Sequence, residues 1–258
     1  MATWILDFHP DFPGSERLAR HLGPARARVV DGLAALGGRW PSSCEGPLVG
    51  YGTMRTMTAL RRHPTLGRAV FDDYAALRCS SYYRHVFDLL GRRFVFSPLG
   101  ALPGLGLERL FGERVFVRPD SNLKLFAARV LPAAALAELA AEWAVHRGEL
   151  VVAAQVVEIV EEFRCFCSHG RFRCGSSYPD EPYHAVPDEV RAFAEVAAAR
   201  LEEGGLPLVT VDVGRLASGA LVVVEAGGVN SWGVYGADLD AFVAMMEEEA
   251  VEREEASR

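Results

Sequence analysis

The sequence has no apolar run of the length that a membrane-spanning helix needs, which is about 20 residues. Residues 1–7 are too short in apolar length for a signal peptide, so we expect a soluble, cytoplasmic protein without a membrane partner. The cysteines are odd in number and lack the spacing of a disulfide framework. They are Cys44, Cys79, Cys165, Cys167 and Cys174. We interpret them as buried reduced thiols, because no second cysteine pair or histidine cluster is present to complete a metal site.

Basic residues are not in excess either. The 27 Lys and Arg residues stand against 34 Asp and Glu residues, which gives a formal net charge of -7. Binding to a nucleic-acid backbone needs clustered cations, so this balance argues against a nucleic-acid partner. Part of the negative charge lies in residues 247–255, which we interpret as a solvated helix end. The chain also lacks the glycine and lysine spacing of a P-loop, which excludes a Walker-type nucleotide site.

What the chain does contain is a regular succession of strand-like and helix-like segments, in 258 residues that are long enough to bury a substantial core. Short apolar or alternating runs predict strands at residues 3–8, 27–30, 47–51, 93–97, 114–118, 125–131, 151–157, 162–168, 172–176, 208–213 and 220–224. Helical spacing predicts helices from residue 15 and at residues 54–62, 82–90, 132–147, 187–203 and 238–255. This order predicts a mixed α+β or α/β fold.

The stretch 99–112 is rich in glycine and proline, which disfavour regular structure, and its apolar content indicates a packed linker. It suggests two domains. We expect an N-terminal α/β domain over residues 1–112 and a second domain over residues 113–258.

Two acidic side chains are delivered by neighbouring strands in the last third of the chain. Thr210 and Asp212 share one face of the first strand, since side chains alternate along it. A hairpin would place Glu225 beside them, with Asn230 shortly after. Oxygen donors of this kind suit Mg²⁺. The alternative is a hairpin whose acids face solvent, and this segment alone leaves both interpretations open.

Two cations flank a polar loop in the middle of the chain. Arg118 ends a strand and Lys124 begins the next, so the pair could hold a polyphosphate. The alternative is that Arg118 pairs with a carboxylate and Lys124 is solvated.

Glu162 and Arg164 share one face of a strand, while Phe163 lies on the other face. They are either an ion pair or ligand groups. The preceding apolar strand ends in Gln155, Val156, Val157 and Glu158, whose backbone could contact an adenine edge. An ordinary strand end is the alternative.

In combination, these segments resemble the ATP-grasp superfamily of carboxylate–amine ligases. The resemblance runs from Val115 to about Met246 and follows the order of that family: phosphate-binding strands, helix, adenine hinge, acid–arginine hairpin, helix and metal strands. The stretch 115–126, VFVRPDSNLKLF, is similar to a subgroup in which arginine replaces the first strand lysine. Residues 162–166, 51–53 and 79–83 are similar to the same subgroup.

The resemblance implies an ATP-grasp fold, with a small N-terminal pre-ATP-grasp layer and a nucleotide site between two β-sheets. It implies that Arg118, Lys124 and Arg164 contact phosphates and that Glu162 lies in the cofactor site. Residues 155–158 would form the hinge around adenine. Asp212, Glu225 and Asn230 would hold Mg²⁺. One position departs from the family pattern: the asparagine usually found two residues after the metal-binding glutamate is replaced here by Gly227.

The implied activity is ATP- and Mg²⁺-dependent ligation of a carboxylate to an amine through an acylphosphate. Small molecules or peptides would be the substrates, and neither one is identified by the sequence. Two alternatives are a small-molecule kinase and a non-catalytic nucleotide-binding module. A homodimer is a reasonable expectation for a soluble enzyme, although the sequence leaves the oligomeric state open.

Overall fold

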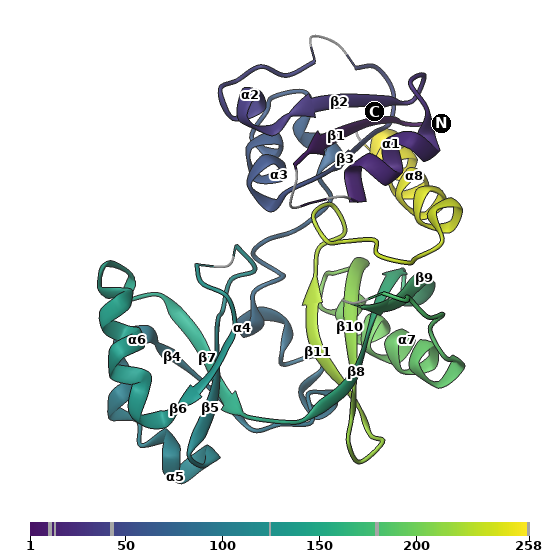
Figure 1. Ribbon diagram of the computed structural model, residues 1–258. Helices are drawn as coiled ribbons and strands as arrows, with labels where there is room; N and C mark the ends of the chain where they lie inside the picture. Colours follow the sequence, from purple (N-terminus) through teal and green to yellow (C-terminus); the bar gives the residue numbers. More distant parts are fainter. Residues whose placement is uncertain (10–11, 13, 42–43, 124, 179–180, 257–258) are drawn as a thin grey trace.

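The computed structural model describes residues 1–256 except 10–11, 13, 42–43, 124 and 179–180. Its strands form three sheets, named here A, B and C (Figure 1). Sheet A lies at the top of the view, and sheets B and C lie below it on the left and the right. The mixed α and β architecture that the sequence predicted is confirmed.

Sheet A is parallel and has the strand order β2-β1-β3. Its central strand is apolar on both faces: Trp4 and Leu6 pack on one side, and Ile5 packs on the other against Met57 and Leu60. Burial on both faces is the usual state of a parallel sheet between helices. The elements of this layer are β1 (Thr3–Phe8), α1 (Gly14–Leu22), β2 (Ala27–Asp31), α2 (Gly32–Leu36), β3 (Leu48–Tyr51) and α3 (Met54–Arg61).

Sheet B is antiparallel and has the order β4-β7-β5-β6. Leu136 and Leu139 of α6 pack with Val115 and Val117 of β5 to form its core. The strands are β4 (Phe94–Pro98), β5 (Arg114–Pro119), β6 (Arg129–Pro132) and β7 (Leu150–Gln155), with helices α5 (Leu107–Phe111) and α6 (Leu136–Glu142).

Sheet C is antiparallel and has the order β11-β10-β8-β9. Helix α7 covers one face and α8 the other, where Phe166 lies 4.9 Å from the ring centre of Phe242. His169 and Gly170 form the predicted two-residue turn of the β8–β9 hairpin, both with positive φ, as a type I′ turn requires. The elements are β8 (Ile159–Ser168), β9 (Arg171–Tyr178), α7 (Asp188–Glu203), β10 (Leu208–Leu216), β11 (Leu221–Gly227) and α8 (Leu239–Ala256).

Four local predictions were wrong in extent. The helix expected at residues 82–90 is replaced by α4 (Cys79–Tyr82) and a short 3-10 turn, because Tyr83 packs edge-on against Phe94. The expected strand at 125–131 narrows to β6, and the helix at 132–147 narrows to α6 between two 3-10 turns. The linker at 99–112 contains a 3-10 helix and α5. Apolar content alone does not distinguish such packed turns from regular elements. The 3-10 segments are Gly67–Ala69, Phe87–Leu89, Leu99–Gly104, Ala133–Ala135 and Ala144–His146.

The domain boundary at residues 112 and 113 stays a prediction. Strand β4 precedes it and pairs with β7 beyond it, so the two parts share sheet B. Among the helices that the structure describes, none combines the length and apolar character needed to cross a bilayer.

Candidate functional site

Three charged residues form a row across sheet C. Asp212 of β10 stands opposite Arg164 of β8 on one side and opposite Glu225 of β11 on the other. Residues directly opposite one another in an antiparallel sheet point to the same face. The predicted placement of Asp212 and Glu225 on a common face is therefore confirmed.

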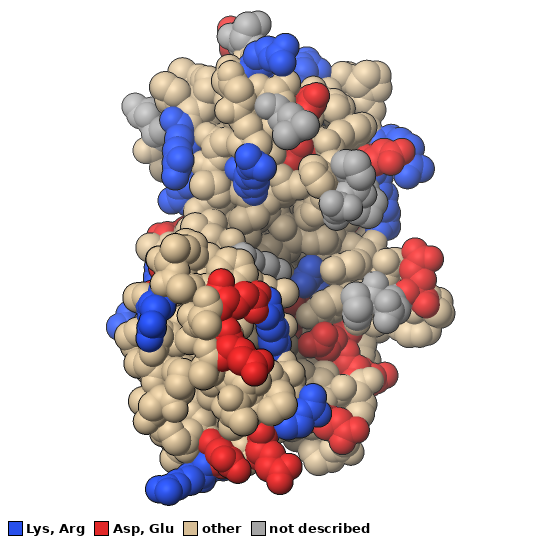
Figure 2. All heavy atoms as spheres, turned by 60° about the vertical axis from the view of Figure 1, so that its left-hand side comes forward, with Lys and Arg blue, Asp and Glu red and all other residues tan. Residues whose placement is uncertain are grey.

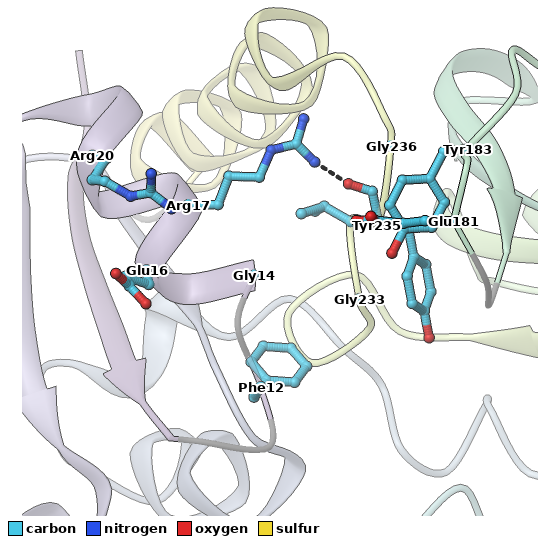
Figure 3. Close-up of a pocket in the computed structure, with 11 residues that line it drawn as sticks. Phe12, Gly14, Glu16, Arg17, Arg20, Glu181, Tyr183, Gly233, Tyr235 and Gly236 are labelled. Carbon is cyan, nitrogen blue, oxygen red and sulfur yellow. Dashed lines mark hydrogen bonds between the residues drawn. The ribbon is translucent and has the colours of Figure 1, made fainter.

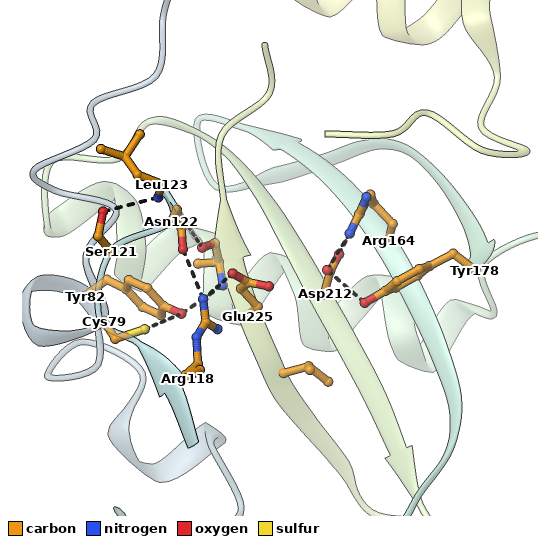
Figure 4. Close-up of polar contacts among 12 residues, drawn as sticks. Cys79, Tyr82, Arg118, Ser121, Asn122, Leu123, Arg164, Tyr178, Asp212 and Glu225 are labelled. Carbon is orange, nitrogen blue, oxygen red and sulfur yellow. Dashed lines mark hydrogen bonds and ion pairs between the residues drawn. The ribbon is translucent and has the colours of Figure 1, made fainter. Parts of the chain in front are cut away.

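Arg164 and Asp212 form a bidentate ion pair. The Arg164 Nε donates to Asp212 Oδ1 at 2.9 Å and its Nη2 donates to Oδ2 at 2.7 Å, and the Tyr178 hydroxyl donates to Oδ2 at 2.9 Å (Figure 4). Only 8% of Arg164 and 1% of Asp212 is exposed. Burial disfavours the charged guanidinium, but Asp212 outweighs it and raises the pKa of Arg164 above its ordinary value. Arg164 is thus held charged by Asp212.

Glu162 is half-buried on the same strand face as Arg164. Burial raises the pKa of Glu162, and the nearby Asp212 carboxylate adds to the rise. The sequence suggested that Glu162 and Arg164 could pair with each other. The structure gives Arg164 a different partner, Asp212.

Aromatic rings enclose the Arg164 guanidinium. Its central carbon lies 4.5 Å from the ring centres of Tyr178 and Trp232 and 5.0 Å from that of Tyr235. Its Nη1 donates to the Gly233 carbonyl at 3.5 Å. These contacts leave the guanidinium little freedom, and they come from strand β9 and from the segment after β11.

Arg118 reaches from sheet B to sheet C. It pairs with Glu225 through Nη2, which also donates to Asn122 Oδ1 at 3.1 Å (Figure 4). The Asn122 amide in turn donates to the Ala226 carbonyl at 3.1 Å. Burial opposes the charge of Arg118, and Glu225 raises its pKa well above the ordinary value. A small cavity of about 140 Å³ lies beside this pair and is lined in part by Ser121 and Phe126.

Sequence reasoning missed the residues that brace Arg118. Asp120 is fully buried and accepts from the Ser80 backbone N at 2.6 Å, from Ser80 Oγ at 3.0 Å and from Arg78 Nε at 2.6 Å. Tyr82, in the same short helix, accepts from the Ala226 N at 3.1 Å. The polar loop after Arg118 was visible in the sequence, but its partners lie about forty residues away in the chain, so no local pattern identified them.

The segment predicted as an adenine hinge joins sheets B and C. Gln155 is the last residue of β7, and residues 156–158 have no regular structure before β8 begins. Gln155 is tied to Arg93 by its backbone N at 2.9 Å and by its Oε1 at 3.3 Å. The Glu158 carbonyl accepts from the Ala217 N at 3.3 Å, while the Glu158 side chain is exposed. Lys124 lies outside the described residues.

Asn230 is placed away from the role that the resemblance implied. Its Oδ1 accepts from the Phe71 and Asp72 backbone N atoms at 2.7 and 3.1 Å. Its Nδ2 donates to the Gly50 and Ala69 carbonyls at 2.7 and 3.2 Å. Four backbone bonds engage the whole amide, which leaves no lone pair for a metal. We correct the implied metal set by leaving Asn230 out.

Gly227 is accounted for by close packing, because a side chain there would overlap the indole of Trp232. The remaining candidate metal ligands are Asp212 and Glu225. Their carboxylates share a face, come from adjacent strands and offer the hard oxygen donors that Mg²⁺ takes, so they fit that ion. Each is balanced by an arginine, so two cations and two anions form a neutral group that a metal and a polyphosphate could divide between them.

A larger cavity, of about 490 Å³, lies between α1 and the segments after β9 and β11 (Figure 3). Tyr235, which contacts Arg164 with its ring, is part of its wall, together with Phe12 and Tyr183. Arg17 lines it and donates to the Tyr235 carbonyl and, at 3.2 Å, to that of Ala237. In Figure 2 the molecule is hollowed between its upper part and its lower part, with acidic and basic atoms in the hollow.

The comparisons with known proteins agree with this architecture. Residues 89–245 match a family model described as an ATP-grasp domain, the second family of its clade. A search of curated proteins finds no match.

Solved structures show the same fold at low sequence identity. D-cycloserine synthetase DcsG is 16% identical with a TM-score of 0.61, covering 99% of this chain and 98% of its own. The ATP-grasp ligase PsnB complexed with a minimal precursor is 16% identical with a TM-score of 0.55, covering 95% and 99%. The D-alanine-D-alanine ligase from Coxiella burnetii is 10% identical with a TM-score of 0.66, covering 100% and 97%.

Proposed function

The chain belongs to the ATP-grasp family, and from that membership we propose that it is an ATP-dependent ligase. Its reaction would join a carboxylate to an amine. A substrate carboxylate is phosphorylated to an acylphosphate, and the amine then displaces phosphate to form an amide. The observation that carries the proposal is the pairing of Arg118 with Glu225 and of Arg164 with Asp212, on facing parts of sheets B and C.

The proposed division of labour is based on charge. Arg118, Lys124 and Arg164 hold the phosphates of ATP, residues 155–158 and Glu162 form the rest of the nucleotide site, and Asp212 and Glu225 hold Mg²⁺. The metal supplies neutralisation of the phosphate charge. The two buried arginines act in a region of low dielectric, where fixed cations stabilise developing negative charge more strongly than in water. The rings of Tyr178 and Trp232 keep water from Arg164 and fix its orientation.

The larger cavity is our candidate for the acceptor pocket. It adjoins Arg164 through Tyr235, so an acceptor held there would lie beside the proposed phosphate-binding group. The solved relatives include a D-alanine-D-alanine ligase and a ligase complexed with a precursor, and we propose a small molecule or a peptide as the substrate here. A cytoplasmic location and a homodimer remain parts of this proposal.

The first prediction tests the metal carboxylates. Asp212→Ala and Glu225→Ala should each remove most of the effect that Mg²⁺ has on ATP affinity, since each deletes one of only two proposed ligands. Calorimetric titration of ATP with and without Mg²⁺ measures this. Glu161→Ala, an exposed acid on β8, is the matched control. Equal Mg²⁺ dependence in the wild type and in both site variants would remove the metal assignment.

The reaction class is decided by the products. With ATP, Mg²⁺ and pooled carboxylic acids and amines, a ligase releases free phosphate. A phosphorylated acceptor without phosphate release would instead indicate a kinase. The absence of any ATP consumption alongside tight binding would indicate a non-catalytic module.

The second prediction concerns Lys124, the single lysine of the chain. An amine-selective acylating reagent can therefore modify only this side chain and the N-terminal amine. If Lys124 contacts phosphates, ATP with Mg²⁺ should slow its acylation about tenfold or more while the N-terminal amine reacts at an unchanged rate. Peptide mass spectrometry measures both rates. Equal acylation of Lys124 with and without ATP would exclude it from the phosphate site.

A further inference from the structure

The segment after β11 is fastened to the N-terminal layer by buried hydrogen bonds. Asn230 is fully buried and bonds the backbone at Gly50, Ala69, Phe71 and Asp72 through its amide. Its own carbonyl accepts from the Gly52 N at 3.0 Å. One residue thus joins the end of β3 and the stretch 69–72 to a segment about 160 residues further along the chain.

Asp72 completes the connection from the other side. Its Oδ1 accepts from the backbone N of Val229 at 2.7 Å and of Asn230 at 3.3 Å. Gly228 allows this approach, because a side chain there would overlap the Asp72 carboxylate. Asp72 and Asn230 therefore bond each other's backbone, in a reciprocal pair that we call the latch.

The latch is costly for Asp72. The residue is 3% exposed and its Oδ2 is buried without a hydrogen-bond partner among the described residues. Burial raises the pKa of Asp72 to about 6, so at neutral pH the fold carries a charge in an unfavourable place. Stability by itself does not account for an acid at this position, which points to a role in placing the chain beyond Asn230.

The wall around Arg164 begins directly after the latch. Trp232 comes two residues after Asn230, stacks on the Arg164 guanidinium and packs against Gly227. Its carbonyl accepts from the buried Tyr51 hydroxyl at 2.9 Å. The neighbouring Gly233 carbonyl accepts from Arg164 itself. Any shift of residues 228–230 therefore moves the groups that orient Arg164.

We propose that Asp72 and Asn230 are positioning residues for the nucleotide site: they hold the segment 227–233 so that Trp232 and Gly233 fix Arg164 against Asp212. The N-terminal layer thus contributes to phosphate binding without touching phosphate. This inference rests on the proposed function, because it assigns Arg164 to ATP. The contacts themselves are independent of that assignment.

The test compares variants that differ in one acceptor. Asp72→Ala removes the acceptor for Val229 and Asn230, whereas Asp72→Asn keeps an Oδ1 in the same place. Asp73→Ala is the matched control, since the exposed Asp73 carboxylate accepts from Ala75 and Ala76 within its own turn. Asn230→Ala serves as a second lesion of the latch, so the test does not depend on one variant folding.

Two measurements separate the latch from the function. Fluorine NMR of protein labelled with 5-fluorotryptophan reports on Trp232 without nucleotide; its resonance is the one of four that Trp232→Phe removes. Calorimetry gives the affinity for ATP with Mg²⁺. Asp72→Ala should shift the Trp232 resonance and weaken ATP binding about tenfold, the loss expected for one or two buried hydrogen bonds. Asp72→Asn should restore the resonance and hold the affinity within about twofold of the wild type.

The outcomes decide between the two claims. An unmoved Trp232 resonance in Asp72→Ala would overturn the latch whatever the nucleotide result. A shifted resonance with unchanged ATP affinity would overturn its positioning role. If wild-type protein binds no ATP, the proposed function fails, and the fluorine measurement still decides whether Asp72 places Trp232.

Discussion

At the scale of single residues, Arg164 shows how a side chain can be both a structural partner and a ligand group. Its two hydrogen bonds to Asp212 compensate a carboxylate that is 1% exposed. Its stacking between Tyr178 and Trp232 fixes the guanidinium plane. A planar fork with five donors can keep such contacts and still offer an N–H to a phosphate, which a lysine ammonium cannot do in the same geometry.

Arg164→Ala should therefore destabilise the fold as well as abolish ATP binding. The change leaves Asp212 buried without its counter-ion, at an expected cost of about 3–5 kcal/mol in the free energy of unfolding. Arg164→Ala combined with Asp212→Ala should recover part of that stability, because no buried charge remains unpaired, but it should not recover ATP binding. Urea unfolding and calorimetry measure the two properties. A double variant as unstable as the sum of its single variants would contradict the pairing.

At the scale of secondary structure, the β8–β9 hairpin controls where Arg164 lies. Gly175 of β9 stands opposite Cys165, and a side chain at this position would overlap the backbone carbonyl of Arg164. The strand carrying the arginine can approach its neighbour only because position 175 has no Cβ. The glycine thus belongs to the architecture of the site although it cannot contact a ligand with a side chain.

Gly175→Ala should push β9 away from β8 at the residue that carries the guanidinium. Overpacking of this kind costs about 1–3 kcal/mol or more, and we expect a lower unfolding temperature together with weaker ATP binding. Gly148→Ala, where no atom lies within 4 Å of the new methyl group, is the control and should leave both properties near those of the wild type. Thermal unfolding and calorimetry on the three proteins check this. Unchanged ATP affinity in Gly175→Ala would show that Arg164 tolerates the displacement.

At the scale of the whole molecule, the last helix joins the N-terminal layer to sheet C. The acidic tail was expected to be a solvated helix end, and this interpretation was wrong for part of it. Glu247 accepts from the Ala2 N at 3.0 Å, from Trp4 Nε1 at 3.1 Å and from Arg26 Nη2 at 2.6 Å. The acids of α8 therefore fasten the two ends of the chain together.

Glu247→Gln should weaken this connection in a pH-dependent way. Burial alone would raise the pKa of Glu247, but the bonds from Arg26, Trp4 and Ala2 outweigh it and lower the pKa below the usual 4.5. A lowered folded-state pKa means that the stabilisation is present above the usual value and is lost as pH falls through the folded-state value. The variant should thus be less stable than wild type at pH 7, with the difference disappearing in acid.

Urea unfolding between pH 3 and pH 7 measures this difference (a range set by the usual Glu pKa, about 4.3). Glu255→Gln, an exposed acid on the same helix, is the control and should follow the wild-type curve. A constant difference between Glu247→Gln and wild type over the whole range would contradict the linkage to carboxylate ionisation.

The sequence by itself determined the features that depend on local periodicity. Alternation along β10 placed Thr210 and Asp212 on one face, and the His169-Gly170 turn was readable because it needs positive φ. Only the tertiary structure decided the partners of the charges: that Arg118 of sheet B meets Glu225 of sheet C, and that Asn230 is consumed by the N-terminal layer. The physical reason is range. Side-chain direction within a strand is set by the backbone of that strand, whereas contacts between sheets depend on packing among segments that are more than a hundred residues apart in the chain.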